Sequence, residues 1–215
     1  MKVLYVTDIH TSEAALRLVR SKGGDYGAVI VGGDMAQDTP ESQAFSMRFL
    51  EAALSACQNV LYVPGNADDP GLVVPARAVS LHGKKVRLGN YSVGGLGGSN
   101  VTPFETPFEL SDEHAEAILR SLGPVDILVS HCPPRGTRCD ADPQAPSGHT
   151  GSAPVKRYVE REKPILVLSG HVHASRAVDN VHGTTIVNPG PLKDGNYAEV
   201  GLNGIISVEL KKAEF

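Results

Sequence analysis

Seven side chains with metal-binding chemistry follow five short apolar segments of this sequence. They are Asp8 and His10 after the first segment, Asp34 after the second, Asn66 after the third, His131 after the fourth, and His171 and His173 after the fifth. A single Asp-x-His or His-x-His pair is common without a metal, but five segments that each end in a ligand give a much stronger signal. Because α/β proteins place their sites at the carboxyl ends of parallel strands, we expect these side chains to converge.

The mixture of carboxylates and imidazoles indicates which metals the site would hold. Such ligands favour Mn, Fe, Co or Zn, whereas an all-oxygen set would indicate Mg or Ca. Seven ligands are too many for one zinc-like ion, but they suit two ions about 3.5–4 Å apart that clamp a phosphoryl group and lower the pKa of a bound water. Asp34 is the expected bridge. We therefore predict two divalent metal ions, with Mn first and Fe, Zn, Co or Ni as alternatives, and hydrolysis of phosphoesters by a metal-bound hydroxide.

The apolar segments that carry these residues are short and rich in Val, Ile and Leu, as is typical of strands covered on both faces. Their ranges are Lys2–Thr7, Ala28–Val31, Val60–Val63, Ile127–Ser130 and Ile165–Ser169. Helical patterns alternate with them at Glu13–Lys22, Glu41–Cys57, Asp112–Leu122 and Ala153–Lys163. Ser111 is the expected N-cap of the third helix. This alternation predicts an α/β fold.

Two further regions predict additional strands. Val86–Leu88 and Tyr91–Val93 flank the Gly89-Asn90 turn signal of a hairpin, Gly94–Ser99 favours a turn, and Thr184–Val187 and Gly204–Leu210 flank the turn-rich segment Asn188–Asn196. A second sheet is therefore expected. The chain shows no repeats or linkers, and its 215 residues suit one domain over residues 1–215.

Composition narrows the functional classes. The net charge of −4 and the scattered lysines and arginines argue against a broad nucleic-acid surface, so no polymer partner is expected. The apolar runs are too short for a membrane span, and no leader precedes the first strand, so we expect a cytoplasmic protein. The three cysteines show no C-x-x-C spacing, which predicts buried thiols instead of disulfides or a zinc site.

The motifs resemble those of the calcineurin-like metallophosphoesterase superfamily, whose pattern is D-x-H, G-D, G-N-H-(D/E), H and G-H-x-H. This chain matches them in order from Asp8 to His173. Gly97-Gly98-Ser99, Ser130-His131-Cys132-Pro133-Pro134 and Asn188-Pro189-Gly190 are also similar to the small Icc-related prokaryotic phosphoesterases. The resemblance therefore covers most of the chain.

That resemblance implies a four-layer α/β/β/α sandwich of two mixed sheets flanked by helices. It also implies that Asp8, His10, Asp34 and His173 hold one ion, and that Asp34, Asn66, His131 and His171 hold the other. The residues expected at the reacting centre are Asp34, Asn66 and His131. Phosphodiesters are the leading substrates, with phosphomonoesters or nucleotides as the alternative.

The chain departs from the family pattern at one position, because Ala67 stands where many members have a histidine after Gly-Asn. That histidine often protonates the leaving group, which alanine cannot do. We therefore expect a preference for good leaving groups unless another acid substitutes, and Asp68 and His149 are the residues to consider. Two other interpretations of Asp68 stay equally open: a partner that orients a metal ligand, or an Asx-turn residue before Asp69-Pro70.

The proline-rich loop Pro133–Thr150 directly follows His131, and long loops inside compact domains are commonly functional. We expect Asn66, His149 and Arg135 to contact a small phosphoester substrate, although solvated loop residues would look the same in sequence. Two alternatives for the activity stay open: a non-catalytic metal-binding scaffold and a nuclease. For the assembly, a homodimer stays open.

Overall fold

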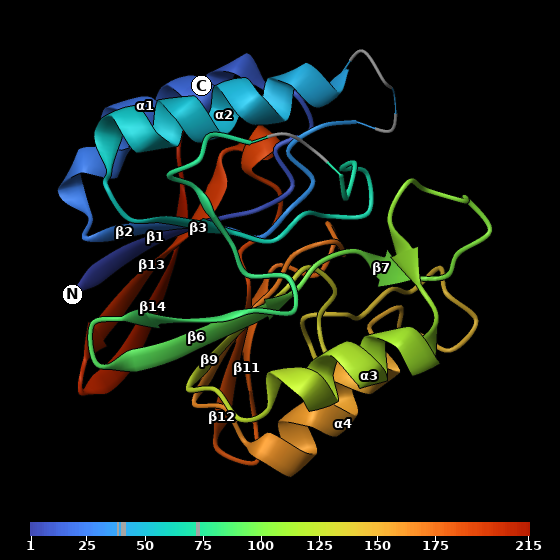
Figure 1. Ribbon diagram of the computed structural model, residues 1–215. Coiled ribbons are helices and arrows are strands. Elements are labelled where there is room, and N and C mark those ends of the chain that lie inside the picture. The colour runs from blue at the N-terminus through green and yellow to red at the C-terminus, as the bar shows by residue number, and fades with distance from the viewer. Residues whose placement is uncertain (38, 40–41, 72–73) are drawn as a thin grey trace.

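Two six-stranded sheets pack face to face, and a pair of helices covers the outer face of each (Figure 1). The structure is a computed structural model that describes residues 1–37, 39, 42–71 and 74–215. The helices are α1 (Glu13–Lys22) and α2 (Gln43–Ala56) on one side, and α3 (Asp112–Leu122) and α4 (Ala153–Glu162) on the other. The predicted four-layer α/β/β/α sandwich is confirmed.

The strands of both sheets run in mixed directions. The first sheet has the order β14 (Ile205–Lys212), β13 (Asn196–Asn203), β1 (Lys2–Val6), β2 (Ala28–Val31), β3 (Val60–Tyr62) and β4 (Val79–Ser80). The second has the order β11 (Ala177–Val181), β12 (Thr184–Asn188), β10 (Leu166–Leu168), β9 (Ile127–Ser130), β6 (Tyr91–Leu96) and β5 (Lys85–Leu88). A parallel pair, β7 (Ser99–Asn100) and β8 (Glu109–Leu110), lies outside both sheets.

Side-chain alternation along the strands produces the layers. On β1, Leu4 and Val6 pack with α1 and α2, whereas Val3 and Tyr5 face the second sheet. The buried faces of α3 and α4 cover the opposite side of the second sheet, which presents residues such as Leu128 on β9. Each strand that is buried on both faces therefore needs a continuous apolar run, which is why these strands are readable in the sequence.

The central strands run parallel, so their carboxyl ends lie together. β1, β2 and β3 pair in parallel in the first sheet, and β6, β9, β10 and β12 do so in the second. The antiparallel strands β13, β14, β5 and β11 lie toward the edges. The segments that follow the central strands therefore meet at one end of the sandwich.

Serine side chains begin three of the helices. Ser111 accepts a hydrogen bond from the His114 N–H, which confirms the predicted cap of α3, and Ser12 and Ser152 do the same for α1 and α4. The predicted start of the second helix, Glu41, lies outside the described residues. None of the helices that the structure describes offers the long apolar stretch that a bilayer span needs.

The prediction of a turn at Gly94–Ser99 is wrong except at Gly97 and Gly98, because Gly94–Leu96 belongs to β6 and pairs with β9, and Ser99 begins β7. The glycines are needed for packing instead. A Cβ on Gly94 would lie 2.9 Å from Leu122, and one on Gly95 would lie 2.6 Å from Val63. Strands β11 and β13 are additions that the sequence did not predict.

Candidate metal centre

All seven predicted ligands meet at the end of the sandwich where β1, β2, β3, β9 and β10 terminate. Six of them form two groups whose ligand atoms lie within 4.8 Å of one another: Asp8, His10 and His173 in one, and Asp34, His131 and His171 in the other. Asn66 joins the second group, because its Oδ1 lies 3.0 Å from His131 Nε2 and 2.9 Å from His171 Nδ1. The strand-end argument therefore placed these side chains together correctly.

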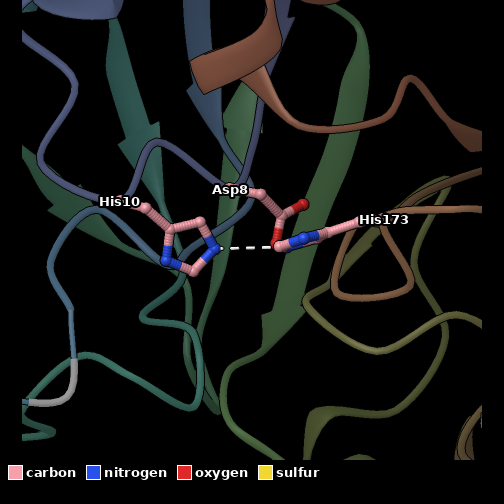
Figure 2. A group of neighbouring side chains, drawn as sticks. All are labelled: Asp8, His10 and His173. Atoms are coloured by element: carbon pink, nitrogen blue, oxygen red, sulfur yellow. Dashed lines mark hydrogen bonds and ion pairs between the residues drawn. The ribbon is translucent and has the colours of Figure 1, made fainter.

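The first group has the spacing of ligands around one ion. Figure 2 shows the side chains of Asp8, His10 and His173 pointing toward one another. The two imidazole Nε2 atoms are 3.1 Å apart, and His173 Nε2 lies 3.4 Å from Asp8 Oδ1. Metal–nitrogen bonds of about 2.0–2.1 Å place two ligands of one ion about 3 Å apart. These residues therefore fit a divalent transition metal.

Asp34 belongs to the second group and also approaches the first. Its Oδ2 is 3.5 Å from His131 Nε2 in the second group and 3.7 Å from His10 Nε2 in the first. Its Oδ1 accepts a hydrogen bond of 2.9 Å from the Ala67 N–H, which fixes the orientation of the carboxylate. One oxygen that faces both groups is the arrangement that a bridging ligand requires.

The protonation states of the second group respond to one another. Burial lowers the pKa of the His131 imidazole, but the Asp34 and Asp8 carboxylates outweigh burial and raise this pKa to about 9. Burial and the charge of His131 lower the pKa of His171 to about 4. Burial raises the pKa of Asp34, but His131 and His10 overcome it and hold that pKa well below its usual range. The carboxylates of Asp8 and Asp34 therefore favour a positive charge at this site, which a bound metal ion would also supply.

The backbone around the ligands is tightly wound. Asp8, His10, Asp34 and His171 all have positive φ values, of 55°, 44°, 51° and 65°. Non-glycine residues adopt this left-handed conformation rarely and at an energetic cost. It turns the chain sharply after β1, β2 and β10, so that ligands from these strands aim at one space.

Glycines let these turns approach one another. A Cβ on Gly65 would lie 2.0 Å from Asp34 Oδ1, and one on Gly170 would lie 2.5 Å from Asp8 Oδ2. Gly33 has φ of +103°, and its Cβ would lie 2.8 Å from His131 Nδ1. These positions need glycine because any side chain would fill the ligand space.

A family model for calcineurin-like phosphoesterases matches residues 1–175. The chain belongs to this family. The resemblance seen in the motifs is thereby confirmed, and membership supports metal-dependent hydrolysis of phosphoric esters. The uncharacterized protein MJ1162 of Methanocaldococcus jannaschii is 31% identical to this phosphoesterase over 199 residues, which cover 89% of this chain and 88% of that protein.

Solved structures share the fold of the phosphoesterase. The protein TT1561 of Thermus thermophilus superposes with a TM-score of 0.73 at 19% identity, over 98% of both chains. A structure described as a novel archaeal phosphodiesterase gives a TM-score of 0.55 at 11% identity, over 98% of this chain and 100% of that chain. At these identities the likeness establishes the fold alone.

A cavity of about 890 Å³ opens beside the ligands. Asn66, His171 and His173 line it, and so do Arg135 and His149, the two loop residues predicted to contact substrate. Its remaining wall comes from residues 100–104 and 106, from the loop residues 142–147, 150 and 151, and from Val172 and Ala174. The predicted substrate residues therefore share one space with the metal ligands.

Asp68 contacts the backbone beside the ligands Asp34 and Asn66 and does not reach the cavity. It is fully buried, and its carboxylate accepts hydrogen bonds from the backbone N–H groups of Gly65, Met35 and Ala36. Burial and the nearby Asp34 charge raise its pKa to about 6. Asp68 therefore holds the loops after β2 and β3 together, and it is not among the described residues that line the cavity.

All three cysteines are free and buried, as predicted, and neither ligand group includes one. Burial raises the pKa of Cys139 to about 12, so its thiol stays protonated.

Sequence reasoning missed two polar residues near the cavity. Thr106 accepts a hydrogen bond of 3.2 Å from Asn66 Nδ2, and buried Asp140 contacts His149. Asp140 had no signal beyond its place in the loop after His131.

Proposed function

We propose that this phosphoesterase hydrolyses phosphodiesters with two divalent metal ions held by the seven converging side chains. The observation that supports this most directly is the position of Asp34 Oδ2, which faces His131 of one group and His10 of the other. A single-ion site would not need one oxygen placed between two complete sets of ligands.

Each ligand has a defined task in this proposal. Asp8, His10 and His173 would hold one ion, Asn66, His131 and His171 would hold the other, and Asp34 would contribute to both. When bound, the ions supply Lewis acidity toward the phosphoryl oxygens and lower the pKa of a water molecule. Mn is the metal that we propose first, and Fe, Zn, Co and Ni also fit this donor set.

His131 acts as a ligand and not as a general base. Its Nδ1–H donates to the Gly32 carbonyl oxygen at 2.8 Å, so the lone pair of neutral His131 lies on Nε2, toward Asp34 and Asn66. To hold an ion, His131 would have to give up the second proton that the neighbouring carboxylates otherwise favour on this ring. The hydrogen bond to Gly32 then keeps the ring oriented.

The shape of the cavity supports a diester over a monoester. Its wall includes the apolar side chains of Val101, Phe104 and Pro146, and Phe104 is 81% exposed. A phosphomonoester needs cationic partners for its additional charge, whereas the second ester group of a diester gains from apolar surface. Arg135 lines the same wall and offers one cation to the phosphoryl oxygens or to a polar ester group.

Hydrolysis of bis-p-nitrophenyl phosphate beside p-nitrophenyl phosphate tests this function. Metal-stripped protein given Mn should hydrolyse the diester faster than the monoester, and Asp34→Asn should lose turnover of both. Asp25→Asn, at an exposed aspartate in the 3-10 turn Gly23–Asp25, is the matched control and should retain activity.

Metal content distinguishes the alternatives. Two ions per chain with faster monoester turnover would favour a monoesterase or nucleotidase, and two ions without turnover of either ester would favour a scaffold. One ion per chain in the active protein would refute the two-metal proposal.

We also propose that residues 1–215 form a single domain that acts on small phosphoesters in the cytoplasm. A measurement of molecular mass in solution would decide whether the protein forms a homodimer.

A further inference from the structure

A buried carboxylate in the loop after β9 holds the imidazole of His149. Asp140 is fully buried, and its oxygens accept hydrogen bonds from the backbone N–H groups of Gly136, Thr137 and Gly151, at 3.1, 2.7 and 3.0 Å. His149 Nδ1 lies 2.9 Å from Asp140 Oδ1. Three backbone donors therefore fix the carboxylate, and the carboxylate fixes the ring.

The loop that carries the pair is itself held in place. The Asp142 N–H donates to the Gly148 carbonyl at 2.9 Å, and the Thr150 N–H donates to the Asp140 carbonyl at 3.2 Å. Ser147 Oγ donates to the His149 carbonyl at 2.7 Å. His149 is therefore positioned more firmly than a solvated loop histidine would be.

Only one ring nitrogen of His149 is left for other partners. Because Nδ1–H donates to Asp140, the remaining site is Nε2, on a ring that lines the same cavity as Asn66, His171 and His173. The side chain is 37% exposed, so it can exchange protons with solvent while it faces that cavity. A carboxylate on the far nitrogen fixes the orientation of the ring, as in catalytic dyads.

The reaction needs such a group, because position 67 supplies none. Ala67 is 6% exposed and has no ionisable proton. The Asp68 carboxylate already accepts hydrogen bonds from backbone N–H groups. We propose that His149 is the proton donor to the leaving group, with Asp140 as its positioning residue. This inference rests on the proposed phosphoesterase function and assigns a step within it.

The step balances as a hydrolysis. The bond between phosphorus and the leaving oxygen breaks, its electron pair stays on that oxygen, and the proton on His149 Nε2 moves to it. A water oxygen forms the new bond to phosphorus and releases its proton to solvent. His149 then takes a proton back from solvent, which completes the cycle.

A leaving-group series tests this assignment in the metal-loaded protein. The substrates are methyl phosphodiesters whose leaving groups rise in pKa from p-nitrophenol through phenol to benzyl alcohol. In the wild type the rate should depend weakly on leaving-group pKa. His149→Gln should lose about 10²- to 10⁴-fold more in rate on the poorest leaving group than it loses on the p-nitrophenyl ester.

Two further variants complete the design. Asp140→Asn should steepen the leaving-group dependence in the same way, and adding it to His149→Gln should cause no further steepening. His114→Gln, at an exposed histidine of α3, is the matched control and should follow the wild type. If Asp140→Asn does not fold, His149→Gln alone still decides the question.

The outcomes separate this inference from the function on which it rests. An equal loss across the whole series, or no loss at all in His149→Gln, would overturn His149 as the proton donor while the phosphoesterase stands. A wild-type protein that hydrolyses none of these esters with metal bound would overturn the proposed function and this inference with it.

Discussion

Replacing Gly65 with alanine should disable the metal centre although no metal ligand is substituted. The added Cβ would lie 2.0 Å from Asp34 Oδ1 and 2.2 Å from the Asp34 backbone nitrogen, where ordinary contacts are 3.4 Å or more. Rotation of the Asp34 side chain cannot relieve the second overlap, so the carboxylate and its loop must move by about 1 Å. A displacement of about 1 Å at a reacting centre costs on the order of 100-fold in rate.

Metal content and turnover together measure this effect. We expect Gly65→Ala to bind fewer than two ions per chain and to lose about 100-fold or more in kcat for bis-p-nitrophenyl phosphate. Gly24→Ala is the matched control, because its Cβ would meet only the Ala56 carbonyl oxygen, at an ordinary 3.6 Å. A folded Gly65→Ala protein with two ions and near wild-type kcat would refute the argument that close approach to Asp34 defines the centre.

Two predictions concern stability and are tested by urea unfolding. Asp126→Asn should lower the free energy of unfolding by about 1 kcal/mol at pH 7, because Asp126 Oδ2 accepts hydrogen bonds from the Ser92 N–H and hydroxyl. Those bonds lower the pKa of Asp126. The carboxylate therefore stabilises the protein fully at neutral pH, and this stabilisation is lost as the pH falls below about 4. An equal loss of unfolding free energy in Asp126→Asn at pH 7 and at pH 3 would contradict this prediction. Phe49→Ala, at a fully buried position of α2, should cost about 3–5 kcal/mol, and a loss under 1 kcal/mol would show that the core refills the space.

The sequence predicted the parts of the fold that need continuous apolar runs. β1, β2, β3, β9 and β10 are covered on both faces, so nearly every position is apolar and each strand stands out. Their ends also carried the ligands, which is why the convergence of these side chains was predictable from their place after the strands. The ends of the strands differ from the predicted ranges by a residue or so, as Lys2–Val6 does from Lys2–Thr7.

The edges of the sheets could not be predicted in the same way. β11 has the sequence AVDNV and exposes polar side chains to solvent, so its pattern resembles a loop. β13 pairs with β1 across nearly the whole length of the chain, and no local signal specifies that partner. Likewise, the His149–Asp140 contact spans nine residues of a proline-rich loop, whose backbone hydrogen bonds are visible only in three dimensions.

The left-handed residues at the strand ends lower the stability of the fold but supply the ligands of the metal centre. Asp8, His10, Asp34 and His171 each hold a backbone conformation that costs about 1 kcal/mol or more, in a protein whose net stability is expected to be about 5–15 kcal/mol. Glycine would adopt the same φ without that cost, but it would remove a ligand. A variant with glycine at any of these positions would therefore lose backbone strain and a metal ligand together, so the strain cannot be removed there without also removing part of the site.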